Sequence, residues 1–121
     1  MNAAYFDITP DVDPKLQNLD QERRRELRQF LIDRRSCLNP TELGLPRTSR
    51  RRVPGLRRDE VAELIGVTSY WYRCFESGRP IRFSPQLISR LIISLQLKAQ
   101  EALTLYRLAI PEIYLVGRYT S

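Results

Sequence analysis

The clearest pattern of hydrophobic and polar positions lies between residues 57 and 78. Apolar residues with helical spacing end at Ile65, and Gly66 then interrupts the pattern. Glycine can take the left-handed backbone conformation that ends a helix. A second stripe then has the i, i+3, i+4, i+7 spacing of an amphipathic helix, and it consists of Thr68, Trp71, Tyr72 and Phe75. The pattern predicts two short helices joined by a tight turn, with Thr68 as the N-cap of the second.

Three further helices are predicted, over residues 20–38, 84–95 and 98–110. Asp20 is the expected N-cap of the first helix, and Pro111 is expected to end the last one. The residues expected to face the core are Leu27, Phe30, Leu31, Leu38, Leu87, Ile88, Leu91, Ile92, Leu95, Ala102, Leu105, Leu108 and Ala109. Together with the helix pair they indicate an all-α domain over residues 21–110.

Three segments fall outside these helices. Residues 1–20 contain two prolines among aspartates, so they are interpreted as an acidic arm without a stable helix. Residues 39–56 form a long connection with three prolines and two glycines. The tail, residues 111–121, is too apolar for a free end; it packs on the bundle, pairs with a second subunit or is the stub of a missing domain.

The charge of the chain is unevenly distributed. The net charge is +6, but residues 1–20 carry −3, whereas residues 21–58 hold twelve arginines against four acidic residues. Guanidinium groups match phosphate oxygens, so this block favours a phosphate-rich partner. A membrane surface is less favoured, because Pro46, Pro54 and Gly55 are interleaved with the arginines around residues 47–58, which therefore do not lie along one face of an amphipathic helix. Without a run of eighteen apolar residues, the sequence predicts neither a membrane span nor a signal peptide, and indicates a cytoplasmic protein.

Several kinds of chemistry are disfavoured by composition. The chain has no histidine, and its two cysteines, Cys37 and Cys74, are far apart. This excludes in practice a zinc site or Cys–His catalysis, and no glycine-rich phosphate loop is present. We therefore expect no catalytic residue, no bound metal and no cofactor.

The outward side of the second helix of the pair offers polar groups for binding. If the apolar stripe faces the core, then Ser69, Tyr70, Arg73 and Ser77 face away from it. Arg73 can make a bidentate contact with guanine. In the first helix, by contrast, most of Arg23, Arg24, Arg25, Arg28, Arg34 and Arg35 are expected to be solvated and to pair with Glu22 and Glu26. One or two of them are expected to reach a phosphate.

The segment LNPTELGLPRTSRRRVPGLRRDEVAELIGVTSYWYRCFESGR, residues 38–79, resembles a known family. GLRR at residues 55–58, WY at 71–72 and ESGR at 76–79 are similar to the N-terminal DNA-binding domain of Xre-type regulators of the MmyB-like group. The resemblance extends over roughly residues 27–109. It implies a five-helix, lambda-repressor-like bundle and a bacterial transcription regulator that binds double-stranded DNA.

On this interpretation the third helix, residues 68–77, enters the major groove, and Ser69, Tyr70 and Arg73 lie nearest the base edges. The residues expected on the sugar–phosphate backbone are Arg50, Arg51, Arg52, Arg57, Arg58, Thr68, Ser77, Arg79, Arg82 and Ser84. For residues 50–52 a solubilising loop is the alternative to a phosphate clamp. A homodimer that reads two half-sites is expected, because one module of this size gives limited affinity.

Full-length relatives commonly continue into a ligand-sensing domain, for which the residues after Ala109 leave no room; the chain is then a fragment or a short natural form.

Two alternatives belong to other classes of protein. A protein-interaction module, such as an antitoxin or adaptor, would use Tyr70 and the apolar tail. A redox sensor or small enzyme based on Cys74 is least favoured, because no activating base is evident.

Overall fold

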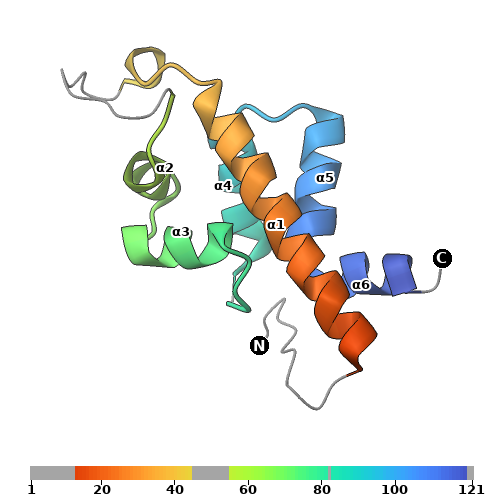
Figure 1. Ribbon diagram of the computed structural model, residues 1–121. Coiled ribbons are helices and arrows are strands. Elements are labelled where there is room, and N and C mark those ends of the chain that lie inside the picture. Colours follow the sequence, from red (N-terminus) through yellow and green to blue (C-terminus); the bar gives the residue numbers. More distant parts are fainter. Residues whose placement is uncertain (1–12, 45–54, 82, 120–121) are drawn as a thin grey trace.

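A computed structural model describes residues 13–44, 55–81 and 83–119. Within these ranges the chain is helical without strands, which confirms the predicted all-α class (Figure 1). The elements are α1 Pro14–Ser36, the 3₁₀ helix η1 Thr41–Leu43, α2 Arg58–Ile65, α3 Ser69–Glu76, α4 Pro85–Ser94, α5 Ala99–Ala109 and α6 Pro111–Tyr119.

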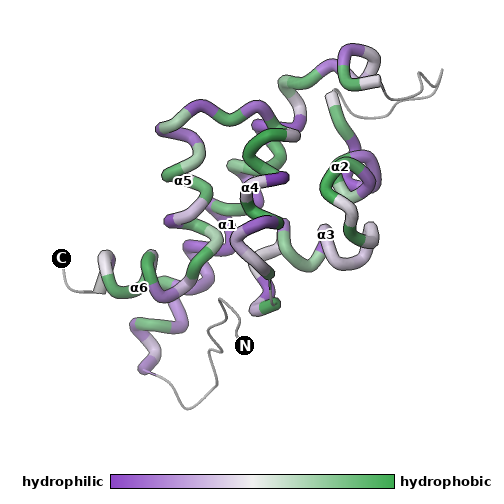
Figure 2. Tube along the Cα trace, turned by 180° about the vertical axis from the view of Figure 1, so that it is seen from behind, coloured by the Kyte–Doolittle hydropathy of each residue, from purple (hydrophilic) through white to green (hydrophobic). Residues whose placement is uncertain are grey.

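The long helix α1 is the element against which most of the others pack. It contacts α3 on one side and α5 and α6 on the other, while α2 contacts α3 and α4 (Figure 1). The view from behind shows α4 in front of α1, with hydrophobic residues recurring along the helices (Figure 2). Leu27 and Leu31 of α1 are at most 1% exposed, so the hydrophobic core lies beneath α1.

Most of the predicted core is confirmed. Leu27, Leu31, Leu87, Ile88, Leu91, Leu95, Leu105, Leu108 and Ala109 are buried, and Phe30, Leu38, Ile92 and Ala102 are half-buried. In α3, Tyr72 and Phe75 are buried, and the half-buried Trp71 stacks on Phe75 with ring centroids 5.3 Å apart. Trp71 therefore belongs to the packing of the domain, as its spacing predicted.

The tight turn between α2 and α3 is also confirmed. Gly66 has a φ of 80°, in the left-handed region, and ends α2. The Thr68 hydroxyl accepts a hydrogen bond from the Trp71 backbone N–H at 3.0 Å. Local signals alone therefore define this helix pair.

The predicted start of the first helix at Asp20 is wrong. α1 begins at Pro14, and the Asp13 carboxylate caps it by accepting from the Lys15 backbone N–H at 2.9 Å. Pro14 was interpreted as a helix breaker, but a proline in the first turn sacrifices no helical hydrogen bond. Asp20 is buried inside α1, and the rest of the predicted arm, residues 1–12, lies outside the described residues.

The expected number of five helices is exceeded by one. α5 ends at Ala109, one residue before the predicted end, and Pro111 then opens a sixth helix instead of a tail. Tyr114 and Leu115 of α6 are buried, and α6 contacts both α1 and α5. Of the three alternatives for this segment, packing on the bundle is the one observed.

Two arginines of α1 that were expected in solvent are buried. Arg23 and Arg35 are only 2% and 8% exposed. Arg23 donates from Nε to Asp20 at 3.0 Å, from Nη1 to the Leu108 carbonyl at 2.9 Å and from Nη2 to the Gly78 carbonyl at 2.8 Å. It therefore ties α1 to the end of α5 and to the turn after α3.

The expected pairing of Glu22 and Glu26 with arginines of α1 is wrong as well. Arg118 of α6 donates to Glu22 at 2.9 Å, and the Tyr114 hydroxyl donates to Glu26 at 2.8 Å. Tyr114 and Arg118 lie one turn apart on α6 and therefore share one side of that helix, and both carboxylates bind to this side. They hold α6 against α1.

Candidate nucleic-acid interface

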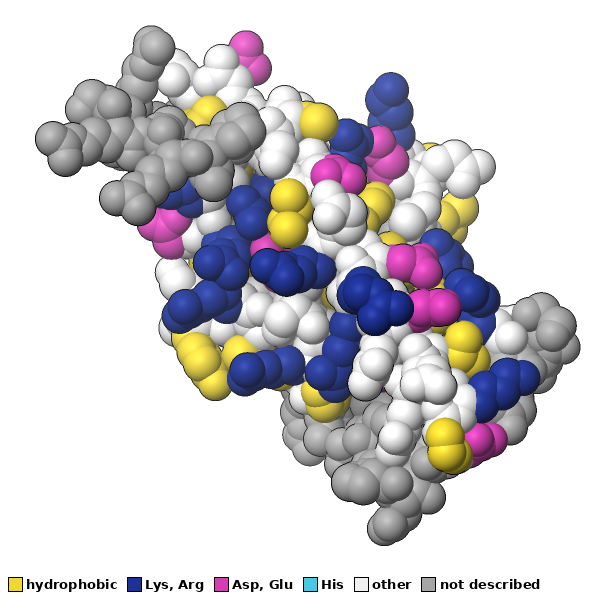
Figure 3. All heavy atoms as spheres, viewed as in Figure 1, with side chains coloured by type: hydrophobic (Ala, Val, Ile, Leu, Met, Phe, Trp, Pro, Cys, Tyr) yellow, Lys and Arg dark blue, Asp and Glu magenta, His cyan; other side chains and the backbone are white. Residues whose placement is uncertain are grey.

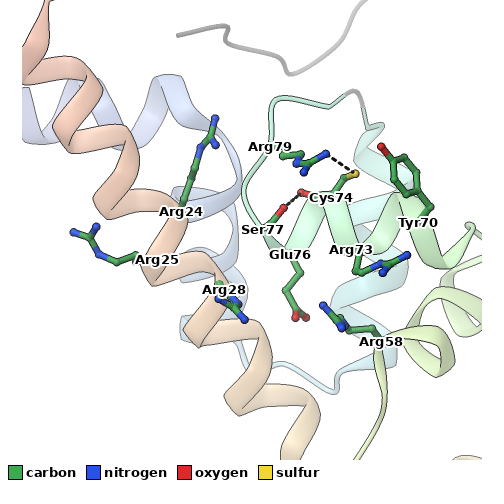
Figure 4. A pocket seen from close by; sticks show the side chains of 10 residues that line it. All are labelled: Arg24, Arg25, Arg28, Arg58, Tyr70, Arg73, Cys74, Glu76, Ser77 and Arg79. Atoms are coloured by element: carbon green, nitrogen blue, oxygen red, sulfur yellow. Dashed lines mark hydrogen bonds between the residues drawn. The ribbon is translucent and has the colours of Figure 1, made fainter.

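A groove of about 500 Å³ lies between α1 and α3. On this face of the molecule a band of Lys and Arg side chains extends over α1 and α3 (Figure 3). The groove is lined by Arg24, Arg25, Arg28, Arg58, Tyr70, Arg73, Cys74, Glu76, Ser77 and Arg79. We call it the basic groove: α1 supplies one wall, α3 with its following turn supplies the other, and Arg58 is contributed by the start of α2 (Figure 4).

Gly78 sets the distance between the two walls at one end of the groove. Its φ is 77°, and a Cβ atom added there would lie 2.6 Å from Cγ of Arg24. Only a glycine lets the turn after α3 pass this close to α1. Arg24 lines the groove from α1, and Arg79 lines it from the turn after α3, where its guanidinium points toward Cys74 (Figure 4).

The Arg35–Glu76 ion pair joins the walls at the other end. Arg35 Nε and Nη2 each donate to a different oxygen of Glu76 at 3.0 Å, and Nη1 donates to the Leu56 carbonyl at 3.0 Å. Burial lowers the pKa of Arg35, but the hydrogen bond and charge of Glu76 outweigh it, so the pKa is raised. Burial, reinforced by Glu76, raises the pKa of Tyr72 well above its ordinary value. The pair therefore fastens the end of α3 to the end of α1.

The α3 wall presents the residues predicted to read bases. Ser69, Tyr70 and Arg73 are all exposed, and Tyr70 retains 64% of its surface. Tyr70 and Arg73 line the basic groove (Figure 4). Ser77 is half-buried, and its hydroxyl donates to the Cys74 carbonyl at 2.9 Å. The predicted outward orientation of this side of the helix is thus confirmed.

Only some of the predicted backbone-contacting residues meet at this groove. Arg58, Ser77 and Arg79 line it. Arg57 is paired instead with Asp59 at 3.3 Å and Glu60 at 3.7 Å. Thr68 and Ser84 are exposed and cap the starts of α3 and α4. Arg50, Arg51, Arg52 and Arg82 lie outside the described residues.

The sequence predicts that one or two arginines of α1 reach a phosphate, but it does not identify which of them line the groove. Arg24 and Arg28 are one helical turn apart, and Arg35 follows seven residues later, so the three share one side of α1. This spacing is a signal that was available in the sequence. It was interpreted as a solvated face, because the sequence does not say that α3 packs beside it.

The positive charge of the basic groove is largely uncompensated. Arg25, Arg28, Arg58 and Arg73 form no ion pair within the described parts of the chain. The carboxylate in the lining, Glu76, is neutralised by Arg35. Six guanidinium groups thus raise the local potential together, an arrangement that attracts an anionic partner.

Comparisons of the chain with protein-family models, with curated proteins and with solved structures gave no match. The family resemblance therefore depends on the sequence motifs alone. In the described ranges, none of the helices combines the length and the hydrophobicity needed to cross a bilayer.

Proposed function

We propose that the protein is a sequence-specific, double-stranded DNA-binding transcription regulator, in which α1–α5 adopt the lambda-repressor-like arrangement. The supporting observation is that the exposed side of α3 forms one wall of the basic groove. Nothing in the packing of a helix pair without a binding role would bring six arginines together around one groove. The role is binding, without catalysis or a resident cofactor.

In the proposed complex α3 lies in the major groove of DNA. A helix with its side chains is about 10–12 Å wide, and the major groove is about 12 Å wide. Ser69, Tyr70 and Arg73 then contact base edges, and Arg73 can donate two hydrogen bonds to a guanine. These three residues determine which sequence is bound.

The sugar–phosphate backbone then passes beside α3. Arg58, Ser77 and Arg79 contact phosphates from the groove, while Thr68 and Ser84 offer helix starts whose backbone N–H groups attract anions. The sequence assigns the same role to Arg50, Arg51, Arg52, Arg57 and Arg82. We propose a cytoplasmic homodimer that is associated with the nucleoid when it is bound.

A selection of binding sites from a pool of randomised duplexes tests the proposal. Fragments retained by the full chain are sequenced and their affinity is measured against random duplexes of equal length. A shared motif, bound about a thousandfold or more above random DNA, supports a sequence-specific regulator. Retention of duplexes without any shared motif contradicts it and favours a protein-interaction module.

A further inference from the structure

We infer that Arg24, Arg25 and Arg28 of α1 form a second phosphate-binding wall, which holds the DNA backbone along one side of α3. The inference rests on the proposed function and names the arginines of the first helix that take part, which the sequence did not identify. The three side chains line the basic groove opposite α3 and its turn (Figure 4).

The geometry of the groove holds this wall in a fixed position. Gly78 packs directly against Arg24, and Arg23 donates to the Gly78 carbonyl at 2.8 Å. At the other end the Arg35–Glu76 pair fastens α1 to α3 through two hydrogen bonds of 3.0 Å. Because α1 and α3 are joined at both ends, a duplex docked on α3 lies at a set distance from the arginines of α1.

The distribution of charge around α1 distinguishes this wall from an ordinary solvated face. The acidic residues Glu22 and Glu26 lie on the side of α1 that faces α6, where Arg118 and Tyr114 bind them. Arg25 and Arg28 are exposed and line the basic groove, and they have no ion pair within the described residues. A solvated face usually intersperses the two signs of charge, whereas here Glu22 and Glu26 are bound by α6 and Asp20 is paired with Arg23 and Arg24.

The position of the wall fits the backbone of a bound duplex. A helix in the major groove has a sugar–phosphate strand on each side, because its own width fills the groove. The α1 wall lies on one of these sides and carries several donors in a row, as a chain of phosphates requires. Arg24 donates from Nε to Asp20 at 3.1 Å, which leaves its terminal nitrogens free to point outward.

The test compares the double variant R25Q/R28Q with the wild-type full chain and with a control variant, K15Q/K98Q. The control removes the same charge at exposed positions outside the groove. Arg24 is left unchanged because it packs against Gly78. Affinities for selected and random duplexes are measured as a function of salt, and thermal unfolding followed by circular dichroism verifies the fold.

If each arginine contacts one phosphate, R25Q/R28Q flattens the slope of log affinity against log salt by about two. Between about 50 and about 200 mM salt, this variant then loses about tenfold less affinity than wild type. Selected and random duplexes weaken alike, and interference by phosphate ethylation disappears at about two positions on one strand. The control does not change the interference pattern.

Two outcomes overturn the inference, and they differ in what else they affect. If wild type binds duplex DNA but R25Q/R28Q keeps the salt slope and ethylation pattern of K15Q/K98Q, the α1 wall does not contact phosphates and the proposed function stands. If wild type itself fails to bind any duplex, the proposed function and the inference both fail.

Discussion

At the scale of single residues, Gly78 controls how closely α3 approaches α1. We expect Gly78→Ala to lower the free energy of unfolding by more than about 1 kcal/mol, because alanine is strained at a φ of 77° and its Cβ would meet Arg24. Gly117→Ala is the matched control, since no atom lies within 4 Å of a Cβ there and the residue is within α6. Alanine at that site should be stabilising. Urea unfolding of both variants measures the difference; equal effects would contradict this account of Gly78.

Arg73 and Arg79 line the same groove, yet we expect different consequences when each is changed to alanine. Arg73→Ala should cost about 1–3 kcal/mol on the selected duplex and relax the preference at one base step, because the bidentate contact to guanine is lost. Arg79→Ala should weaken selected and random duplexes alike and flatten the salt slope by about one. Mobility-shift titrations on both kinds of duplex measure these effects. If both variants weaken both kinds of duplex by the same factor, the division between base reading and backbone contact is wrong.

At the scale of elements, the Arg35–Glu76 pair fastens α3 to α1. We expect Glu76→Gln to lower the free energy of unfolding by about 3 kcal/mol, because Arg35 remains buried without a countercharge. Glu22→Gln removes a carboxylate from a largely exposed pair and should cost less than about 1 kcal/mol. Denaturant unfolding measures both changes. Comparable losses would show that the Arg35–Glu76 pair is no more important than a surface pair.

The docking of α6 on α1 should be sensitive to alkaline pH. Burial, together with the hydrogen bond to Glu26, raises the pKa of Tyr114 from 10.0 to about 12. Between these two values the unfolded chain loses the phenolic proton while the folded chain keeps it, so stability falls as pH rises through this window. Below pH 10 the contribution is fully present. Unfolding free energies from pH 9 to about 12 should fall in wild type, and Tyr114→Phe should show a smaller fall, because the buried Tyr72, whose pKa is also raised, still contributes. Equal pH dependence in both proteins would assign the loss to other groups.

Local elements were predictable from the sequence, whereas long-range partners were not. Gly66 and Thr68 act on their own neighbours, so the α2–α3 turn and the outward side of α3 followed from spacing. Pro14 and Pro111 were expected to interrupt helices, but each is the first residue of one. A proline breaks a helix only in its interior and is tolerated in the first turn. The burial of Arg35 depends on Glu76, 41 residues away, and that of Arg23 on a carbonyl 85 residues away. No local pattern contains that information. The spacing of Arg24 and Arg28 is local, but the packing of α3 beside them is not, so the sequence could not identify these arginines as part of the groove.

At the scale of the whole molecule, α1 divides the charge of the domain. Its acidic side holds α6, and its basic side faces α3 across the groove. Six arginines are therefore gathered around one groove, although the net charge of +6 is moderate for 121 residues. A groove of this kind orients the approach of a polyanion and makes binding dependent on ionic strength.

The spacing of half-sites on DNA is the remaining prediction at this scale. One module has limited affinity, so we expect a homodimer bound to two half-sites about one helical turn, near 34 Å, apart. Inserting about 5 base pairs between the half-sites turns one of them to the opposite face of the duplex and should abolish cooperative binding. Inserting about 10 base pairs returns both to one face and should restore part of it. Mobility-shift assays with sedimentation of the complex measure the stoichiometry. A complex of one chain per duplex, indifferent to both insertions, would show that the protein reads DNA as a monomer.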